Sequence, residues 1–415
     1  MSTPSFLDSF AAPSSTAPPT QGAVALPRRL RGMLSLDDFE DAARRFLPRP
    51  VFAYVSGGCE TDRALRANRE GFTAWEWVTR TLVDTSRRSI ATPLLGHTYA
   101  APFGIAPMGI SALSAYRGDL VQAQAAAAAN IPMIMSGSSL IRMEEVARAY
   151  PRAWFQAYVP GDPLHIGALL DRVEAAGFGT LVVTVDVPVS GNRENNIRAG
   201  FSTPLRPGAR LAWEGLTHPG WLFSTALRTL VRHGMPHFEN SAAKRGAPIL
   251  SSNVLRDFGA RDHLDWSHVD QMRRRWKGPL VVKGILGAAD AQRARDHGAD
   301  GVILSNHGGR QLDGAVPALR MLPSVVQALG PDYPVMIDGG FRRGGEVLMA
   351  LALGAKFVFV GRPFNYAGAV AGEAGVRHAI GILASEIHRN MAMLGALSPA
   401  DLGPDHLLPS LRGCY

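Results

Sequence analysis

The sequence is poor in cysteine and has no long apolar run. Cys59 and Cys414 are its only cysteines, too few and too far apart for a disulfide framework or a metal cluster. We therefore expect a reducing compartment and no metal site. No stretch of about 18 apolar residues occurs, so no segment is predicted to span a membrane.

Clustered charge is also scarce, although the chain is basic. The 415 residues include 43 Lys+Arg, the net charge is +8 and the pI is about 9.9. The only polybasic block is Arg273-Arg274-Arg275, so we expect no nucleic-acid partner. A basic face toward anionic lipid or anionic substrates fits the same composition. The hydrophobic share of 46% indicates a sizeable core, in one large domain or two smaller ones.

The first 27 residues, Met1 to Pro27, lack the basic start and the apolar centre of a secretion signal. They are rich in Ala, Pro, Ser and Thr, and we interpret them as a disordered leader. Residues 28–415 are then the folded domain, with a cytoplasmic location expected. A helix is predicted over Leu36 to Leu47, and a second helical pattern over residues 50–71 is broken at Ser56-Gly57-Gly58. Residues 72–101 are predicted to be irregular or to form short strands.

From residue 102 onward, short apolar runs alternate with helical segments such as Asp119 to Ala129 and Pro163 to Ala176. Eight alternating strands predict a parallel sheet closed into a (β/α)8 TIM barrel, behind an N-terminal helical cap. A doubly wound open sheet is the alternative. The eight runs are residues 103–106, 133–135, 154–158, 181–185, 280–282, 302–304, 335–337 and 357–360.

The connection between the fourth and fifth runs, Gly191 to Lys277, is far longer than one βα unit needs. Its middle part mixes Trp213, Trp221, Phe223 and Phe238 with arginines and histidines. Such a mixture suits a membrane interface, and a lid packed on the barrel rim is the alternative.

Polar residues follow the strand runs where a barrel would gather them at one mouth. Asp338-Gly339-Gly340-Phe341-Arg342 and Gly361-Arg362 provide glycine turns and arginines after the last two strands, a usual phosphate position. Lys283 ends a buried strand, where it could form a Schiff base or hold negative charge on a cofactor ring.

A candidate acid–base pair and a candidate carboxylate clamp lie at the same mouth. His307 ends the sixth run, and Asp186 across the mouth would orient it and stabilise its protonated form, as a general base requires. Arg193 and Arg310 could clamp a carboxylate, because a guanidinium matches its two oxygens.

The run Ser305-Asn306-His307-Gly308-Gly309-Arg310-Gln311 resembles the signature of the FMN-dependent L-2-hydroxy acid oxidases and dehydrogenases. That family includes glycolate oxidase, L-lactate dehydrogenase and mandelate dehydrogenase, and the resemblance extends from about Ser35 to the end. It implies FMN across the barrel mouth and oxidation of an L-2-hydroxy acid to the 2-oxo acid. We also expect a homo-oligomer, a tetramer being one option.

The resemblance assigns a role to each strand end. His307, Asp186 and Tyr158 would be catalytic, and Tyr158, Arg193, Arg310 and the position of Phe39 would contact the substrate. Lys283 would sit by N1 and O2 of the flavin. The expected cofactor-binding residues are Pro107, Met108, Gly109, Ser136, Gln156, Thr184, Lys283, Ser305, Asp338, Gly340, Arg342, Gly361 and Arg362.

Two positions depart from the family pattern. Phe39 is placed where relatives usually have a tyrosine that donates to the substrate carboxylate, and Ser138 replaces a tryptophan of glycolate oxidase, which suggests a roomier pocket.

The identity of the electron acceptor depends on other residues. Gly109 occupies a position where the oxidases of this family often have alanine and several dehydrogenases have glycine, so the resemblance favours a dehydrogenase that reduces quinone or another acceptor. The segment Thr217-His218-Pro219 with Trp221 resembles that of membrane-associated L-lactate dehydrogenases, so peripheral attachment to the inner membrane face is a second option for location. The alternatives are an oxidase that makes hydrogen peroxide, an aldolase using Lys283, and an inactive flavin-binding, membrane-associated protein.

Overall fold

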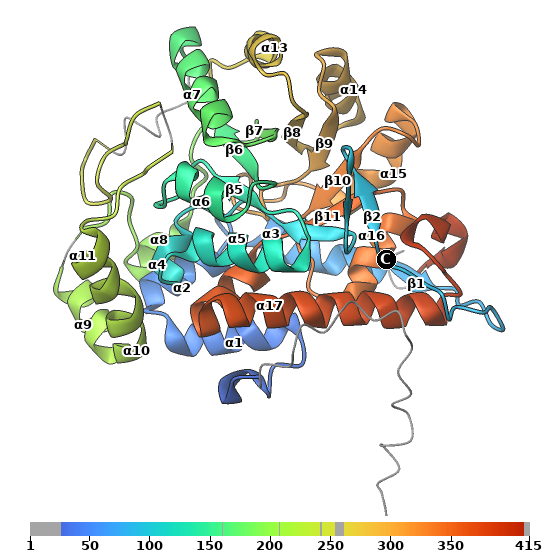
Figure 1. The fold of residues 1–415 in the computed structure, drawn as a ribbon, viewed down its shortest axis with the longest axis horizontal. Coiled ribbons are helices and arrows are strands. Elements are labelled where there is room, and N and C mark those ends of the chain that lie inside the picture. The colour runs from blue at the N-terminus through green and yellow to red at the C-terminus, as the bar shows by residue number, and fades with distance from the viewer. Residues whose placement is uncertain (1–25, 160, 207, 241–242, 254–260, 411–415) are drawn as a thin grey trace, which may run out of the picture.

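The computed structural model describes residues 26–159, 161–206, 208–240, 243–253 and 261–410. Residues 1–25 of the predicted leader and Cys414 lie outside these ranges. An N-terminal helix of the described residues lies along the last long helix of the chain (Figure 1). Its centre is an eight-stranded parallel sheet.

The described part of the N-terminal cap contains three α-helices, three short strands and two 3-10 turns, Arg28–Leu30 and Gly71–Ala74. Helix α1 (Leu36–Phe46) begins with a capping box, in which Asp38 accepts hydrogen bonds from the backbone N–H groups of Leu34 and Ser35. The glycine pair after Ser56 ends α2, as predicted. The remaining cap elements are α2 (Arg49–Ser56), α3 (Arg63–Glu70), β1 (Trp75–Trp77), β2 (Thr92–Leu94) and β3 (His97–Tyr99).

The sheet runs in the order β4-β11-β10-β9-β8-β7-β6-β5, and a parallel bridge between Ile105 and Met133 joins β4 to β5. The sheet therefore closes on itself, which confirms the barrel and excludes the open-sheet alternative. The strands are β4 (Phe103–Ile105), β5 (Ile134–Ser136), β6 (Trp154–Tyr158), β7 (Thr180–Thr184), β8 (Leu280–Ile285), β9 (Gly301–Leu304), β10 (Val335–Asp338) and β11 (Phe357–Val360).

Eight helices surround the barrel, and their ends follow local sequence signals. Helix α7, for example, begins at Pro163, and the carboxylate of Asp162 accepts hydrogen bonds from the N–H groups of Leu164 and His165. The surrounding helices are α5 (Gly118–Ala129), α6 (Met143–Ala149), α7 (Pro163–Ala176), α13 (Trp266–Arg275), α14 (Ala288–Asp296), α15 (Ala318–Leu329), α16 (Gly344–Ala352) and α17 (Arg362–Met393).

Strand residues alternate between two cores. Val182, Val281 and Ile303 fill the barrel interior, whereas Leu181 and Val183 pack between the strands and the helices. Helix α1 lies along α17, so the cap closes one side of the barrel (Figure 1).

The long connection between β7 and β8 is mostly helical in its described part. It contains α8 (Glu194–Ala199), α9 (Ala209–Thr217), α10 (Pro219–Trp221), a π-helical turn (Leu222–Leu227) and α11 (Arg228–His233). Helices α9, α10 and α11 gather at one end of the molecule (Figure 1). Trp221 and Phe238 are buried, whereas Trp213 and Phe223 are about two-thirds exposed, at 66% and 67%. The segment thus packs on the rim and also presents apolar side chains to its surroundings.

Candidate active site

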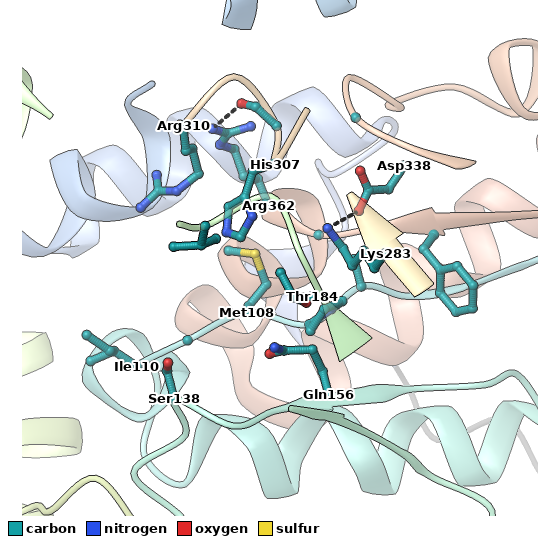
Figure 2. Close-up of a pocket in the computed structure, with 18 of the residues that line it drawn as sticks. Met108, Ile110, Ser138, Gln156, Thr184, Lys283, His307, Arg310, Asp338 and Arg362 are labelled. Carbon is teal, nitrogen blue, oxygen red and sulfur yellow. Dashed lines mark hydrogen bonds and ion pairs between the residues drawn. The ribbon is translucent and has the colours of Figure 1, made fainter. Parts of the chain in front are cut away.

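A cavity of about 230 Å³ opens where the carboxyl ends of the strands meet. Residues from all eight strands or the loops directly after them line it, and α2 closes one side through Tyr54. Figure 2 shows side chains from these separate segments pointing into one space. The predicted convergence on one mouth is therefore present in the fold.

Most residues expected at the site line this cavity, and three lie directly behind it. Ser136, Asp186 and Ser305 form the second group, and each contacts a lining side chain. The lining group contains Pro107, Met108, Gly109, Gln156, Tyr158, Thr184, Arg193, Lys283, His307, Arg310, Asp338, Gly340, Arg342, Gly361 and Arg362.

His307 and Asp186 form a direct pair, with 3.0 Å between Nδ1 and Oδ1. Because Nδ1 faces an acid, it carries the hydrogen in the neutral imidazole and Nε2 is the basic nitrogen. Burial lowers the pKa of His307 below its ordinary value, although Asp186 opposes this effect. Burial also disfavours the Asp186 carboxylate, but the attraction of His307 and Lys283 outweighs it and lowers the pKa of Asp186. The pair therefore combines a neutral base with an ionised acid.

Lys283 is held as a cation at the bottom of the mouth. Its Nζ lies 3.1 Å from Oδ2 of Asp338 and donates to Oγ of Ser305 at 2.9 Å, and Figure 2 marks the contact with Asp338. Burial acts against the charge, but Asp338 and Asp186 outweigh it and raise the pKa of Lys283. A protonated lysine is a poor nucleophile for a Schiff base and a good partner for negative charge on a ring.

Several buried polar atoms of the described residues point to a missing partner. Gln156 accepts hydrogen bonds at Oε1 from Ser136 Oγ and the N–H of Gly137, and its Nε2 has no partner. Thr184 Oγ1 and Asp338 Oδ1 are also without one. Leaving buried polar atoms unpaired is costly, so these three suit a bound ligand rich in polar groups. Met108 lies among them in Figure 2, and with Pro107 and Gly109 it forms an apolar wall for a flat ring.

Two buried arginines also line the cavity. Arg342 and Arg362 both line it and are each 9% exposed. Arg362 donates to the backbone oxygens of Val55 and Gly308, which fixes its guanidinium beneath the mouth. A ring wall with unpaired amide and hydroxyl groups, together with two buried arginines, fits a phosphorylated flavin.

A second arginine pair lies near His307. Arg193 donates to Gln311 Oε1, and Arg310 donates to the carbonyl of Gly57. Burial and the neighbouring Arg193 lower the pKa of Arg310 to about 9, which leaves it charged at neutral pH and in need of an anion. Tyr158 keeps its proton, because burial and Asp186 raise its pKa. Its hydroxyl can therefore donate to an anionic substrate.

The expectation for Phe39 is wrong. Its side chain is fully buried between α1 and α17, with its ring 6.1 Å from that of His378, and it does not line the cavity. An apolar residue on the inner face of an amphipathic helix belongs to the core. Tyr54 of α2 lines the cavity instead, and its ring lies 5.1 Å from the guanidinium carbon of Arg310. In the sequence, the position of Tyr54 just before the Ser56-Gly57-Gly58 turn was the signal that could have placed it at the cavity.

The barrel and its mouth are those of a flavin-dependent oxidoreductase. The family model described as FMN-dependent dehydrogenase matches residues 43–409. The chain is 39% identical over 378 residues to an L-lactate dehydrogenase of Pseudomonas aeruginosa, covering 90% of this chain and 98% of the relative. It is 36% identical over 378 residues to an (S)-mandelate dehydrogenase of Pseudomonas putida, covering 91% and 94%.

A solved structure agrees with these sequences. The crystal structure of the monotopic membrane protein (S)-mandelate dehydrogenase superimposes with a TM-score of 0.84 at 35% identity, over 92% of this chain and 100% of the other. The chain belongs to the FMN-dependent dehydrogenase family, and FMN is its cofactor.

Proposed function

We propose that the protein oxidises an L-2-hydroxy acid to the 2-oxo acid and passes two electrons and two protons to an acceptor other than oxygen. The observation that carries this proposal is the His307–Asp186 pair beside Arg193 and Arg310 at the flavin cradle. When bound, FMN supplies the group that receives the two electrons from the substrate.

The protein side chains divide the remaining work. Arg193 and Arg310 hold the α-carboxylate, and Tyr54 and Tyr158 donate to the substrate oxygens. Nε2 of His307 takes a proton from the bound acid, and Asp186 stabilises the imidazolium that results.

The test is an anaerobic panel of L-2-hydroxy acids mixed with the FMN-loaded protein while flavin absorbance is recorded. We expect several members of the panel to bleach the flavin. The variant His307→Gln should retain FMN and lose turnover. Turnover of this variant at a near-normal kcat would contradict the role of His307, and a flavin that no member bleaches would contradict the activity itself.

The proposal of a dehydrogenase depends on Gly109. A Cβ at this position would lie 3.1 Å from Cβ of Ser138 and 3.4 Å from the hydroxyl of Tyr54, so glycine leaves space at the mouth that alanine would fill. We expect fast reduction of a soluble quinone and slow formation of hydrogen peroxide. Equal rates with oxygen and quinone would instead indicate the oxidase. The aldolase alternative receives no support, because Lys283 is paired with Asp338.

We propose that the protein attaches to a membrane through the surface of α9 to α11. Trp213, Leu216, Phe223 and Val231 are exposed there beside the exposed cations Arg228 and Arg232. Apolar side chains flanked by arginines suit an anionic lipid interface, and no helix in the described ranges is long and apolar enough to cross a bilayer. The name of the mandelate dehydrogenase relative, a monotopic membrane protein, supports the proposal.

Flotation with vesicles of anionic and of neutral lipid tests this attachment. The double variant Trp213→Ser/Phe223→Ser should remain in the soluble fraction while it keeps the flavin spectrum of the parent. Unchanged flotation of the variant would refute the assignment of this surface.

A further inference from the structure

The loop after β4 turns at Ile110 through a backbone conformation that isoleucine rarely adopts. Its φ is +62° and its ψ is +21°, in the left-handed region. Among the described residues other than glycine that have a positive φ, Ile110 is the one whose side chain branches at Cβ. Branching at Cβ strains this conformation, so the surrounding structure must hold the residue in it.

Hydrogen bonds hold Ile110 on both sides. Its N–H donates to the carbonyl of Ser138 at 3.2 Å, and its carbonyl accepts from the N–H of Leu113 at 2.9 Å. The short helix α4 (Ser111–Ser114) that follows is anchored in turn, because Nε1 of the buried Trp221 donates to the carbonyl of Leu113 at 2.7 Å. The strained turn is thus fixed by the loop after β5 on one side and by the long connection on the other.

This turn places Ile110 on the wall of the cavity near the proposed carboxylate site. Ile110 lines the cavity and is 5% exposed, so packed protein lies behind it. A Cβ on the preceding Gly109 would lie 3.4 Å from the Tyr54 hydroxyl, and the Tyr54 ring is 5.1 Å from the guanidinium carbon of Arg310. Ile110 therefore follows directly on the residue that borders the carboxylate site.

The neighbours of Ile110 on this wall add little bulk beside it. Gly109 has no side chain, and Ser138, whose carbonyl accepts from Ile110, has a small one. Figure 2 shows Ile110 and Ser138 on the same side of the cavity. Ile110 has the largest side chain of the three, and it is apolar, so it sets the position of this part of the wall.

We infer that Ile110 is a specificity-determining residue, whose side chain meets the substituent on C2 of the bound acid and limits the length of that substituent. The inference rests on the proposed function, in which Arg193 and Arg310 hold the carboxylate and His307 faces the hydroxyl. The remaining substituent on C2 then extends toward Ile110. A wall residue that is held by its backbone and backed by packed protein cannot move aside, so an extra carbon on the substrate meets a fixed boundary.

A series of unbranched L-2-hydroxy acids, from lactate to 2-hydroxyoctanoate, tests this boundary by anaerobic flavin bleaching of the FMN-loaded protein. In the parent, kcat/KM should reach a maximum at one chain length and fall beyond it. Ile110→Ala removes the side-chain carbons beyond Cβ, so its maximum should move to a longer acid. For the first acid beyond the maximum of the parent, kcat/KM relative to L-lactate should rise on the order of tenfold, the usual effect of one methylene at such a boundary. Ile110→Val should give a smaller shift in the same direction.

Ile380→Ala is the matched control, because Ile380 of α17 is also 5% exposed and packs in the core. It should lower the melting temperature and keep the chain-length profile of the parent. A parent profile that does not fall with length, an unchanged maximum in Ile110→Ala or an equal loss for every acid would overturn the inference, as would the same shift in the control. A flavin that no 2-hydroxy acid bleaches would instead overturn the proposed function, so the two failures are distinct.

Two further measurements do not require turnover. Ile110→Gly and Ile110→Ala both lose the branched side chain, but glycine adopts a positive φ without strain, so the glycine variant should melt at the higher temperature. The opposite order would overturn the argument that a strained backbone fixes Ile110. Unbranched carboxylic acids without a hydroxyl bind without being oxidised, and their affinity is followed by perturbation of the flavin spectrum. The chain length that binds most tightly should be longer in Ile110→Ala than in the parent, and an equal optimum would contradict the boundary.

Discussion

The variant Asp186→Asn tests the electrostatic support of His307. The side chains of both residues are less than one-fifth exposed, at 12% and 19%, so solvent screens their contact only in part. Two unit charges about 4 Å apart attract by about 4 kcal/mol at an effective dielectric constant near 20. Loss of the carboxylate therefore lowers the pKa of His307 further, because the imidazolium loses its anionic partner. Since each 1.36 kcal/mol of barrier is a tenfold change in rate, loss of about 3 to 4 kcal/mol should slow proton transfer by about 100- to 1,000-fold.

The measurement is the rate of flavin bleaching at saturating L-2-hydroxy acid, followed anaerobically by stopped flow. Asparagine has nearly the shape of aspartate, so FMN content and thermal stability should change little. Asp290→Asn, an exposed acid of α14, provides the matched control and should keep the parent rate. A bleaching rate in Asp186→Asn within threefold of the parent would refute the reasoning.

Three further outcomes are expected. Burial lowers the pKa of His307, so kcat/KM should fall only below pH 6.5 as the base becomes protonated, and a midpoint at pH 7 or above would contradict this. Gly284→Ala should abolish turnover, because Gly284 has a φ of +107° and the new Cβ would lie 2.6 Å from Cβ of Asp186. A normal kcat in this variant would show that the loop adapts. Tyr54→Phe should raise KM about tenfold by loss of one donor to a charged group, whereas Phe39→Leu should lower only the melting temperature.

The barrel could be predicted because each strand run carries its own local signal. Buried parallel strands are continuous apolar runs, and β6 and β11 have the predicted boundaries. The ends of other strands shifted by one to three residues. The run at 280–282 continues to Ile285, because Lys283 still pairs in the sheet with β7 and β9 before the register shifts. The charge of Lys283 does not end the strand, because its ion partner Asp338 lies beside it.

For residues of the cap and of the long connection, local sequence signals could not predict which side chains reach the cavity. Phe39 and Tyr54 both belong to amphipathic helices, and the choice between the core and the cavity depends on how α1 and α2 dock on α17 and α8. Arg261 lies far from any strand run in the sequence, and only the folded connection brings it to Tyr158. Strand ends are fixed by the barrel, whereas these positions depend on contacts between distant segments.

The turn after β9 explains why the segment around His307 needs its particular residues. His307, Gly308 and Gly309 have φ values of +57°, +63° and +75°, a left-handed sequence that residues with a Cβ rarely adopt. A Cβ on Gly309 would lie 2.4 Å from the backbone nitrogen of Leu65, so glycine also permits α3 to pack against the turn. The N–H of His307 donates to Ser305 Oγ, which itself accepts from Lys283. The strained backbone is thus held from both sides, and it is this turn that directs the imidazole toward Asp186.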